Sequence, residues 1–401
     1  MGRLCKGGKM MGALANAKQA GREAVLAKIK EAGLWEFGLK KEALSDKFER
    51  AAEGAAVEAG LNNADTDKVL LGLLKDTPEK VLEGIAVAGF LTGTESLSLY
   101  LPESETELTE ALKDKAEAYG IQLFNEIINV RAAGDAVLLH IVTAADLADL
   151  MDGCYQKGVY VSVDGAPLQK KAADTGIGEL VSLGSAKAVK LGYRYYTPNE
   201  AESLTAADAT TGLIHVLTDK DCIVAETRDQ MTEYRKVSCG KCVFCREGLI
   251  QLEYEQKETT QARGKMEFLD LTKEIGDAMK FSCLCSVGQE AAKAALDATE
   301  KFTGEYEAHI RKNKCPAGVC TAFVHIYIDP HTCTGCGECL DVCPADCIEG
   351  KDKYIHMIDE FDCTRCGKCI EACEEGAVIQ TAGKLPKLPN RLTKVGKFRR
   401  H

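Results

Sequence analysis

Two cysteine quartets near the end of the chain share one spacing, C-x2-C-x2-C-x3-C. The first consists of Cys333, Cys336, Cys339 and Cys343, and the second of Cys363, Cys366, Cys369 and Cys373. This repeat is typical of a segment that holds two [4Fe–4S] clusters, because each quartet supplies three thiolates from one tight loop and sends its fourth to the other cluster. Zinc sites or disulfides explain it less well, since zinc sites use separate CxxC pairs.

The crossed arrangement predicts two ligand sets. The first cluster is expected to take Cys333, Cys336, Cys339 and Cys373, and the second Cys363, Cys366, Cys369 and Cys343. Residues 329–383 are therefore expected to form a bacterial-type ferredoxin domain with two [4Fe–4S] clusters. Such a domain indicates electron transfer.

A third cysteine group lies in the segment Ser238–Gly248. Cys239, Cys242 and Cys245 again stand three positions apart, and a cubane held by these three needs a distant fourth thiolate. Cys285 is a better candidate than Cys283, because the Ser-Val-Gly that follows it lets the backbone approach a cluster. We predict a third [4Fe–4S] cluster held by Cys239, Cys242, Cys245 and Cys285. The alternative is a partial motif without metal.

Four further residues could bind zinc. Cys315, Cys320 and His309 form a group of soft ligands in a proline-interrupted linker, and Cys222 is our first choice for the fourth ligand. Zinc bound by Cys222, His309, Cys315 and Cys320 would fix the ferredoxin domain to the rest of the chain. Reduced thiols without metal are the alternative.

Composition limits the classes of function. Nineteen cysteines without a secretory leader indicate reduced or metallated thiols in the cytoplasm, and no stretch approaches the roughly 18 apolar residues of a membrane span. The formal charge of −11 argues against nucleic acid as a partner, although residues 384–401 carry seven Lys or Arg and no acid. We expect this basic tail to lie on a partner subunit. No residue pattern suggests acid–base or nucleophilic catalysis, so we name no catalytic residue.

Patterning divides the remaining chain into three zones. Residues up to about 155 combine helical periodicity with short apolar runs at 96–101 and 136–142, which predicts an α/β domain. Residues 156–225 carry short β-branched runs separated by turn signals, which predicts a β-rich module. Residues 226–312 contain amphipathic helices, which we expect at 226–236 and 291–311.

The third cysteine group carries a family resemblance. Ser238–Gly248, with the later Cys285-Ser-Val-Gly288, resembles the cluster-binding region of the NADH-binding flavoprotein subunit of respiratory complex I. The run from Glu307 to Cys320, which leads into a two-cluster ferredoxin, resembles the beta subunit of electron-bifurcating hydrogenases. The resemblance implies that residues 156–225 form an SLBB-like β-grasp module.

The first domain departs from this family where cofactors would bind. The family implies a glycine-rich loop, an acidic Asn-Ala-Asp-Glu-Gly loop and a Gly-Glu-Glu segment for FMN and NADH. This chain has Trp35-Glu-Phe-Gly in place of the glycine loop, keeps only Asn63-Ala-Asp65 of the acidic loop, and lacks both glutamates after Gly134. A flavin phosphate needs glycines that present backbone N–H groups, so we expect no FMN. A divergent flavin site near Gly134 and Asp135 is the alternative.

The predicted fold class is α+β multidomain, with six segments. These are a degenerate α/β nucleotide-binding domain (1–155), an SLBB-like β-grasp module (156–225), a helical [4Fe–4S] domain (226–312), a linker with a candidate zinc site (313–328), the ferredoxin domain (329–383) and the basic tail (384–401).

We expect an iron–sulfur subunit that relays electrons through three [4Fe–4S] clusters. Its partners would be flavoprotein or metal-containing catalytic subunits of a hetero-oligomeric complex, or a soluble ferredoxin. The alternatives are a flavin-containing NAD(P)H dehydrogenase subunit of a bifurcating complex, and a structural or assembly subunit whose clusters stabilise the fold.

Overall fold

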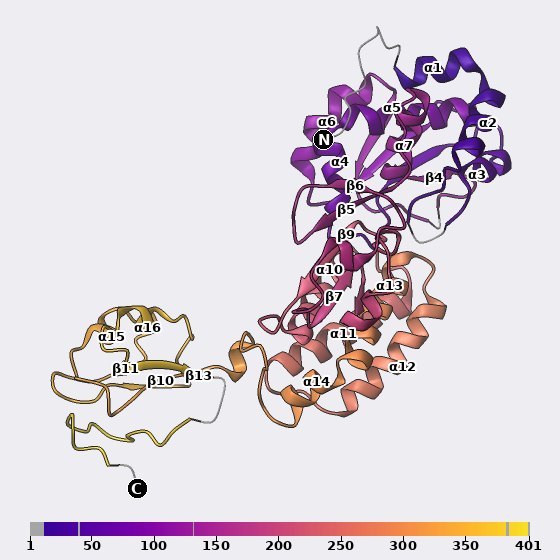
Figure 1. Cartoon of the computed structure of the whole chain (residues 1–401). Helices are drawn as coiled ribbons and strands as arrows, with labels where there is room; N and C mark the ends of the chain where they lie inside the picture. Colours follow the sequence, from indigo (N-terminus) through magenta and orange to yellow (C-terminus); the bar gives the residue numbers. More distant parts are fainter. Residues whose placement is uncertain (1–11, 39–40, 131, 382–384, 400–401) are drawn as a thin grey trace. The chain divides into compact units, whose positions relative to one another are not determined.

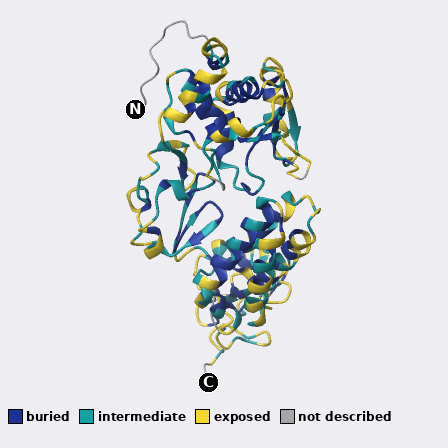
Figure 2. Cartoon of the chain, turned by 90° about the vertical axis from the view of Figure 1, so that its right-hand side faces the viewer, coloured by how far each residue is buried: buried dark blue, intermediate teal, exposed yellow. Residues whose placement is uncertain are grey.

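The computed structural model describes residues 12–38, 41–130, 132–381 and 385–399 (Figure 1). The chain forms two compact units. The first comprises the residues up to Thr218 with Asp229–Leu252 and Thr272–Lys301, and the second comprises Asp219–Arg228, Glu253–Leu271 and the residues from Phe302 onward. Figure 2 shows buried residues gathered in the interior of each part and exposed residues on the outer surfaces.

The N-terminal domain contains a four-stranded parallel sheet. Its strands are β1 (Val57–Gly60), β2 (Leu97–Leu101), β3 (Ile121–Asn125) and β4 (Val137–His140), in the order β3-β2-β1-β4. The register pairs Val57 with both Leu97 and Val137. Because the order reverses between β1 and β4, the carboxyl ends of these two strands flank the crevice in which such sheets bind ligands.

Helices surround this sheet. They are α1 (Ala13–Ala20), α2 (Arg22–Ala32), α3 (Leu44–Arg50), η1 (Val69–Leu71), α4 (Gly72–Asp76), α5 (Pro78–Thr92), α6 (Thr106–Glu117) and α7 (Ile141–Met151). The α/β domain and its strand at 96–101 are thus found. The run at 136–142 is a shorter strand than expected, because the His140 side chain accepts a hydrogen bond from Val142 N (3.1 Å) and starts α7.

Helices α5 and α7 pack against each other at a glycine. Both contact β1, and both are buried along most of their length. A Cβ atom on Gly84 of α5 would lie 1.8 Å from the carbonyl oxygen of Ala144 in α7. Only glycine therefore permits this close approach of the two helix backbones.

The β-rich module has a mixed five-stranded sheet. Its strands are β5 (Val159–Val163), β6 (Gln169–Lys171), β7 (Ala188–Leu191), β8 (Arg194–Tyr196) and β9 (Leu213–Leu217), in the order β6-β5-β9-β7-β8. The short helices are α8 (Ile177–Leu180), α9 (Pro198–Ala201) and η2 (Ala206–Asp208). Strand β5 runs parallel to β9, and the other pairs are antiparallel.

A buried polar network joins this module to the N-terminal domain. The Tyr193 hydroxyl donates to one carboxylate oxygen of Asp65, and His140 Nε2 lies 3.2 Å from the other. His140 Nδ1 accepts the hydrogen bond from Val142, so Nε2 carries the proton and donates it to Asp65. Thr211 likewise donates to Asp67. The two parts are therefore fixed to each other inside the first unit.

Helices follow the β-rich module. They are α10 (Ile223–Val237), α11 (Val243–Thr260), α12 (Glu267–Ser282), α13 (Ser286–Lys301) and α14 (Thr303–Ile310). Our expectation of one helix over 291–311 was wrong. The chain breaks at Phe302, whose φ of −120° and ψ of 31° are not helical, so α13 and α14 are separate helices.

The C-terminal region is built from two short antiparallel sheets. Strand β10 (His325–Ile328) pairs with β13 (Val378–Thr381), and β11 (Ile348–Glu349) pairs with β12 (Met357–Ile358). The helices are η3 (Thr321–Phe323), α15 (Glu338–Asp341) and α16 (Lys368–Ala372). Among the described residues, no helix is both long and apolar enough to span a membrane.

Residues 393–398 of the basic tail lie on their own chain. Ile355 N donates to Thr393 O (2.9 Å), Val395 N donates to Lys353 O (3.1 Å), and Phe398 packs on the apolar core of the cysteine-rich domain. Residues 393–398 thus contact the cysteine-rich domain of the same chain, and the expectation that the tail lies on a partner subunit stays a prediction. Backbone hydrogen bonds to residues 353–355 hold this segment in place.

The Gly84 contact yields a stability prediction. Gly84→Ala should lower the free energy of unfolding by about 3 kcal/mol, because the added methyl forces α5 and α7 apart. Gly184→Ala is the control, since a Cβ there meets no atom within 4 Å, and it should change stability by less than about 0.5 kcal/mol. Urea unfolding of the anaerobically purified chain measures both. Equal stability of the two variants would contradict the close packing.

Candidate iron–sulfur and metal sites

The second predicted ligand set surrounds one cavity in the C-terminal region. Its thiols belong to Cys343, Cys363, Cys366 and Cys369, with Cys347 beside them. The loop before α16 carries Cys363 and Cys366, and Cys369 lies on α16 itself. Backbone N–H groups point at these sulfurs, as Arg365 N does at Cys363 Sγ (3.4 Å). Such N–H groups stabilise thiolates.

The first predicted set also converges. Burial raises the pKa of Cys339 to about 12, with further contributions from the nearby Cys333, Cys336 and Cys373. Thiols this close cannot all ionise unless a cation compensates their charge. Ala377 N donates to Cys373 Sγ (3.3 Å). The donor set suits iron, which Cys thiolates bind in cubane clusters.

The third group lies where the loop before α11 meets the turn between α12 and α13. Cys239, Cys242 and Cys285 line a cavity of about 680 Å³, and Cys245 lies in the first turn of α11. Cys283 is buried against Cys245, and a hydrogen bond between them lowers the pKa of Cys245 to about 6. A Cβ on Gly288 would lie 2.4 Å from Cys283 Sγ. Gly288 therefore makes room for Cys283.

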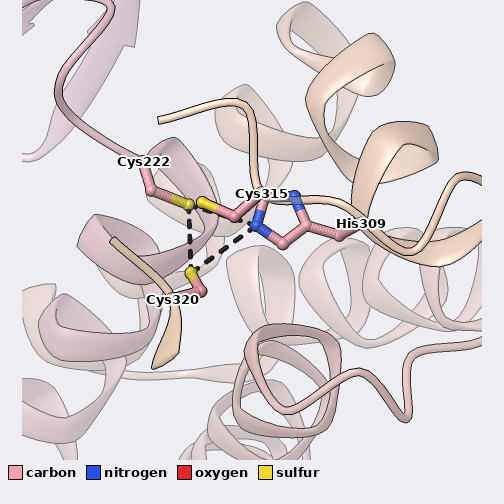
Figure 3. A group of neighbouring side chains, drawn as sticks. All are labelled: Cys222, His309, Cys315 and Cys320. Carbon is pink, nitrogen blue, oxygen red and sulfur yellow. Dashed lines mark hydrogen bonds between the residues drawn. The ribbon is translucent and has the colours of Figure 1, made fainter. Parts of the chain in front are cut away.

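Cys222, His309, Cys315 and Cys320 form a compact buried group (Figure 3). Their ligand atoms all lie within 4.8 Å of one another, and no side chain is more than 4% exposed. Cys222 Sγ is 3.4 Å from His309 Nε2 and 3.5 Å from Cys320 Sγ. Tetrahedral zinc, with bonds of about 2.0–2.3 Å, separates its ligands by similar distances.

The histidine of this group is oriented for metal binding. His309 Nδ1 lies 2.8 Å from the carbonyl oxygen of Glu305, which can only accept, so Nδ1 carries the proton. Nε2 therefore points its lone pair at the three sulfurs. Hydrogen bonds within the group, first of all with Cys222, lower the pKa of Cys315, whereas the bond to Cys315 raises that of Cys222.

The protein's own carboxylate occupies the crevice of the N-terminal domain. Glu36 Oε1 accepts hydrogen bonds from His140 N (2.7 Å) and the Thr143 hydroxyl (3.1 Å), both at the start of α7. Lys47 Nζ lies 3.0 Å from Glu36 Oε2. A helix N-terminus at this position attracts anions, and here Glu36 supplies the negative charge.

Asn63 and Asp65, which match the acidic loop of the family, form hydrogen bonds within the protein. Asn63 exchanges two hydrogen bonds with the backbone of Ile128 (2.8 and 3.1 Å), and Asp65 is held in the buried network with Tyr193 and His140. Gly134 and Asp135 line neither of the two large cavities beside Cys285.

Three arrangements were missed from the sequence. Glu36 at α7, the Asp65–His140–Tyr193 network and Cys347 beside the cavity of the second predicted ligand set all depend on tertiary contacts. Only Cys347 left a signal, because it follows Cys343 at a spacing that brings both sulfurs to one turn. Seventeen of the described cysteines carry free thiols.

Two family models match the cysteine-rich segments. Residues 225–309 match the NADH-ubiquinone oxidoreductase-F iron-sulfur binding region, and residues 325–374 match the 4Fe-4S dicluster domain. The first match confirms the resemblance that the third cysteine group indicated. The second places both C-terminal quartets in a 4Fe–4S domain, as their spacing predicted.

Individual relatives agree with these models. HndC, a subunit of the NADP-reducing hydrogenase of Solidesulfovibrio fructosivorans, is 38% identical over 157 residues, which are 39% of this chain and 32% of HndC. The F subunit of the NADH-quinone oxidoreductase of Mycobacterium tuberculosis H37Rv is 32% identical over 123 residues, which are 30% of this chain and 27% of that protein. The chain thus spans about a third or less of these curated relatives.

A solved structure shares the fold. The NAD+-reducing [NiFe]-hydrogenase in its H2-reduced state superposes with a TM-score of 0.64 at 17% sequence identity, covering 75% of this chain and 66% of that one. This likeness extends over a larger share of the chain than the sequence matches do. The protein therefore carries the iron–sulfur binding region of the NADH–ubiquinone oxidoreductase F family together with a 4Fe–4S dicluster domain, and it is a relative of NADH-oxidoreductase and hydrogenase subunits.

Proposed function

We propose that the chain is an iron–sulfur electron-transfer subunit of a multisubunit oxidoreductase, in which three [4Fe–4S] clusters relay electrons between partner redox subunits. The observation that carries this proposal is the convergence of three separate cysteine groups, each inside a segment that matches an iron–sulfur family model. When bound, such clusters accept and donate single electrons. The named relatives are subunits of redox enzymes, which supports a place for this chain in a similar complex.

The proposed ligands are the twelve cysteines with the predicted spacing. In the third group, Cys285 lies with Cys239 and Cys242 on the same cavity, which supports Cys285 over Cys283 as the fourth ligand. Cys283 would then remain a thiol that donates a hydrogen bond to Cys245. A donated hydrogen bond to a ligand sulfur raises the reduction potential of a cluster.

We propose that the N-terminal domain is a scaffold without FMN. The carboxylate of Glu36 repels a phosphate from the start of α7. The side chains of Asn63 and Asp65 already form hydrogen bonds within the protein. One observation favours the alternative of a flavin-containing dehydrogenase subunit. The cavity of about 680 Å³ beside Cys239 and Cys285 is roomy and carries Lys68, Lys236 and Lys241.

Metal and flavin analysis separates these functions. The anaerobically purified chain should contain about twelve irons and as many acid-labile sulfides, without FMN. One FMN per chain, with absorbance that NADH bleaches, would show a dehydrogenase subunit. Clusters that dithionite cannot reduce would instead support a structural role.

We also propose a structural zinc ion at Cys222, His309, Cys315 and Cys320. Three thiols and one correctly protonated imidazole match a closed tetrahedral zinc site. Cys222 directly precedes α10, whereas His309 lies on α14, and Cys315 and Cys320 lie in the loop that precedes η3. Zinc would therefore fasten three segments of the second unit together.

Removing the histidine should release this zinc. His309→Ala should lower the zinc content from about one ion per chain to near zero, and the melting temperature should fall because a structural zinc contributes directly to folding. His215→Ala is the matched control, since His215 is partly exposed and pairs with Asp164 instead. Elemental analysis and thermal melting measure the outcome. A His309→Ala protein that keeps its zinc refutes the site.

A further inference from the structure

The cavity of the second cluster is lined by five thiols rather than four. Cys343, Cys363, Cys366 and Cys369 are the proposed ligands, and Cys347 is the additional thiol on the same cavity. A cubane takes one thiolate for each of its four irons, so one of the five thiols is in excess.

Cys347 lies at the cavity in the same way as the four proposed ligands do. Its sulfur lies 3.5 Å from Cys343 Sγ, and the residue is only 5% exposed. The backbone at Asp346 adopts a φ of +50°, which turns the chain back so that Cys347 faces the cavity. Asp359 N then donates to Cys347 O (2.8 Å) and holds the position at the start of β11. The thiol is thus fixed beside Cys343 and better buried than Cys343 is.

The internal repeat supplies a natural comparison. The fourth ligand proposed for the first cluster, Cys373, is followed by the same kind of turn, with Gly376 at a φ of +63° where the other turn has Asp346. The residue that matches Cys347 is Ala377, whose N–H donates to Cys373 Sγ (3.3 Å). One turn of the repeat thus carries a spare thiol and the other does not.

We propose that Cys347 is a reserve ligand of the second cluster, able to replace Cys343. This inference rests on the proposed cluster-binding function. In the exchange, the Cys347 thiol gives up its proton and forms a bond to iron, the bond from iron to Cys343 breaks, and the Cys343 thiolate takes up a proton. No electron is gained or lost. A cluster that loses a thiolate without replacement can release that iron and become a three-iron cluster, and Cys347 prevents this.

Alanine variants of the full-length chain test the proposal. Cys343→Ala should keep about twelve irons, because Cys347 supplies the missing thiolate, and its second cluster should show a shifted potential. The matched variant Cys373→Ala lacks a spare thiol, so it should lose about one iron. After one-electron oxidation with ferricyanide, it should give the electron paramagnetic resonance signal of an oxidised three-iron cluster. The double variant Cys343→Ala/Cys347→Ala should behave like Cys373→Ala.

Two outcomes would overturn the proposal. One is a Cys343→Ala protein that loses iron as Cys373→Ala does, and the other is a double variant no worse than the single one. If the Cys343 variants fail to fold, Cys347→Ala alone decides. As purified, the Cys347→Ala protein should keep every cluster. After the same brief exposure to ferricyanide, it should form more three-iron cluster than the wild type. Equal amounts of three-iron cluster in the two proteins would refute the reserve role. Wild-type protein without the second cluster would instead refute the proposed function itself.

Discussion

Converging thiols govern the architecture of the cysteine-rich part of this protein. Several buried sulfurs within a few ångströms cannot all carry charge unless a cation balances them, as the raised pKa of Cys339 illustrates. The local structure of this part brings the cysteines close together. Short loops with left-handed glycines such as Gly335 and Gly367 turn the chain sharply between neighbouring cysteines. Cysteines from two such segments line the same cavity.

The N-terminal domain has a parallel sheet whose strand order reverses at one point. The order β3-β2-β1-β4 places the carboxyl ends of β1 and β4 at the point of reversal. Glu36 neutralises the start of α7, and Asp65 is bound to Tyr193 of the β-rich module. These contacts support the proposal that the N-terminal domain serves as a scaffold.

The sequence predicted the sites better than the packing around them. Metal ligands follow strict spacing rules, so the quartets could be assigned to domains. Cys222, His309, Cys315 and Cys320 could be proposed as one group, and the structure brings them together although 98 positions separate Cys222 from Cys320. Glu36 could not be predicted, because an exposed and a crevice glutamate look alike in a sequence. The break at Phe302 and the docking of the tail through Thr393 and Val395 likewise depend on tertiary contacts. The β-grasp label for residues 156–225 stays a prediction.

The number of electrons that the chain accepts tests the relay without flavin most directly. In an anaerobic coulometric titration of the purified chain, three one-electron clusters predict about three electrons per chain, with no flavin radical in the electron paramagnetic resonance spectrum. About five electrons per chain, with such a radical at intermediate potentials, would contradict the account, because a bound flavin accepts two more.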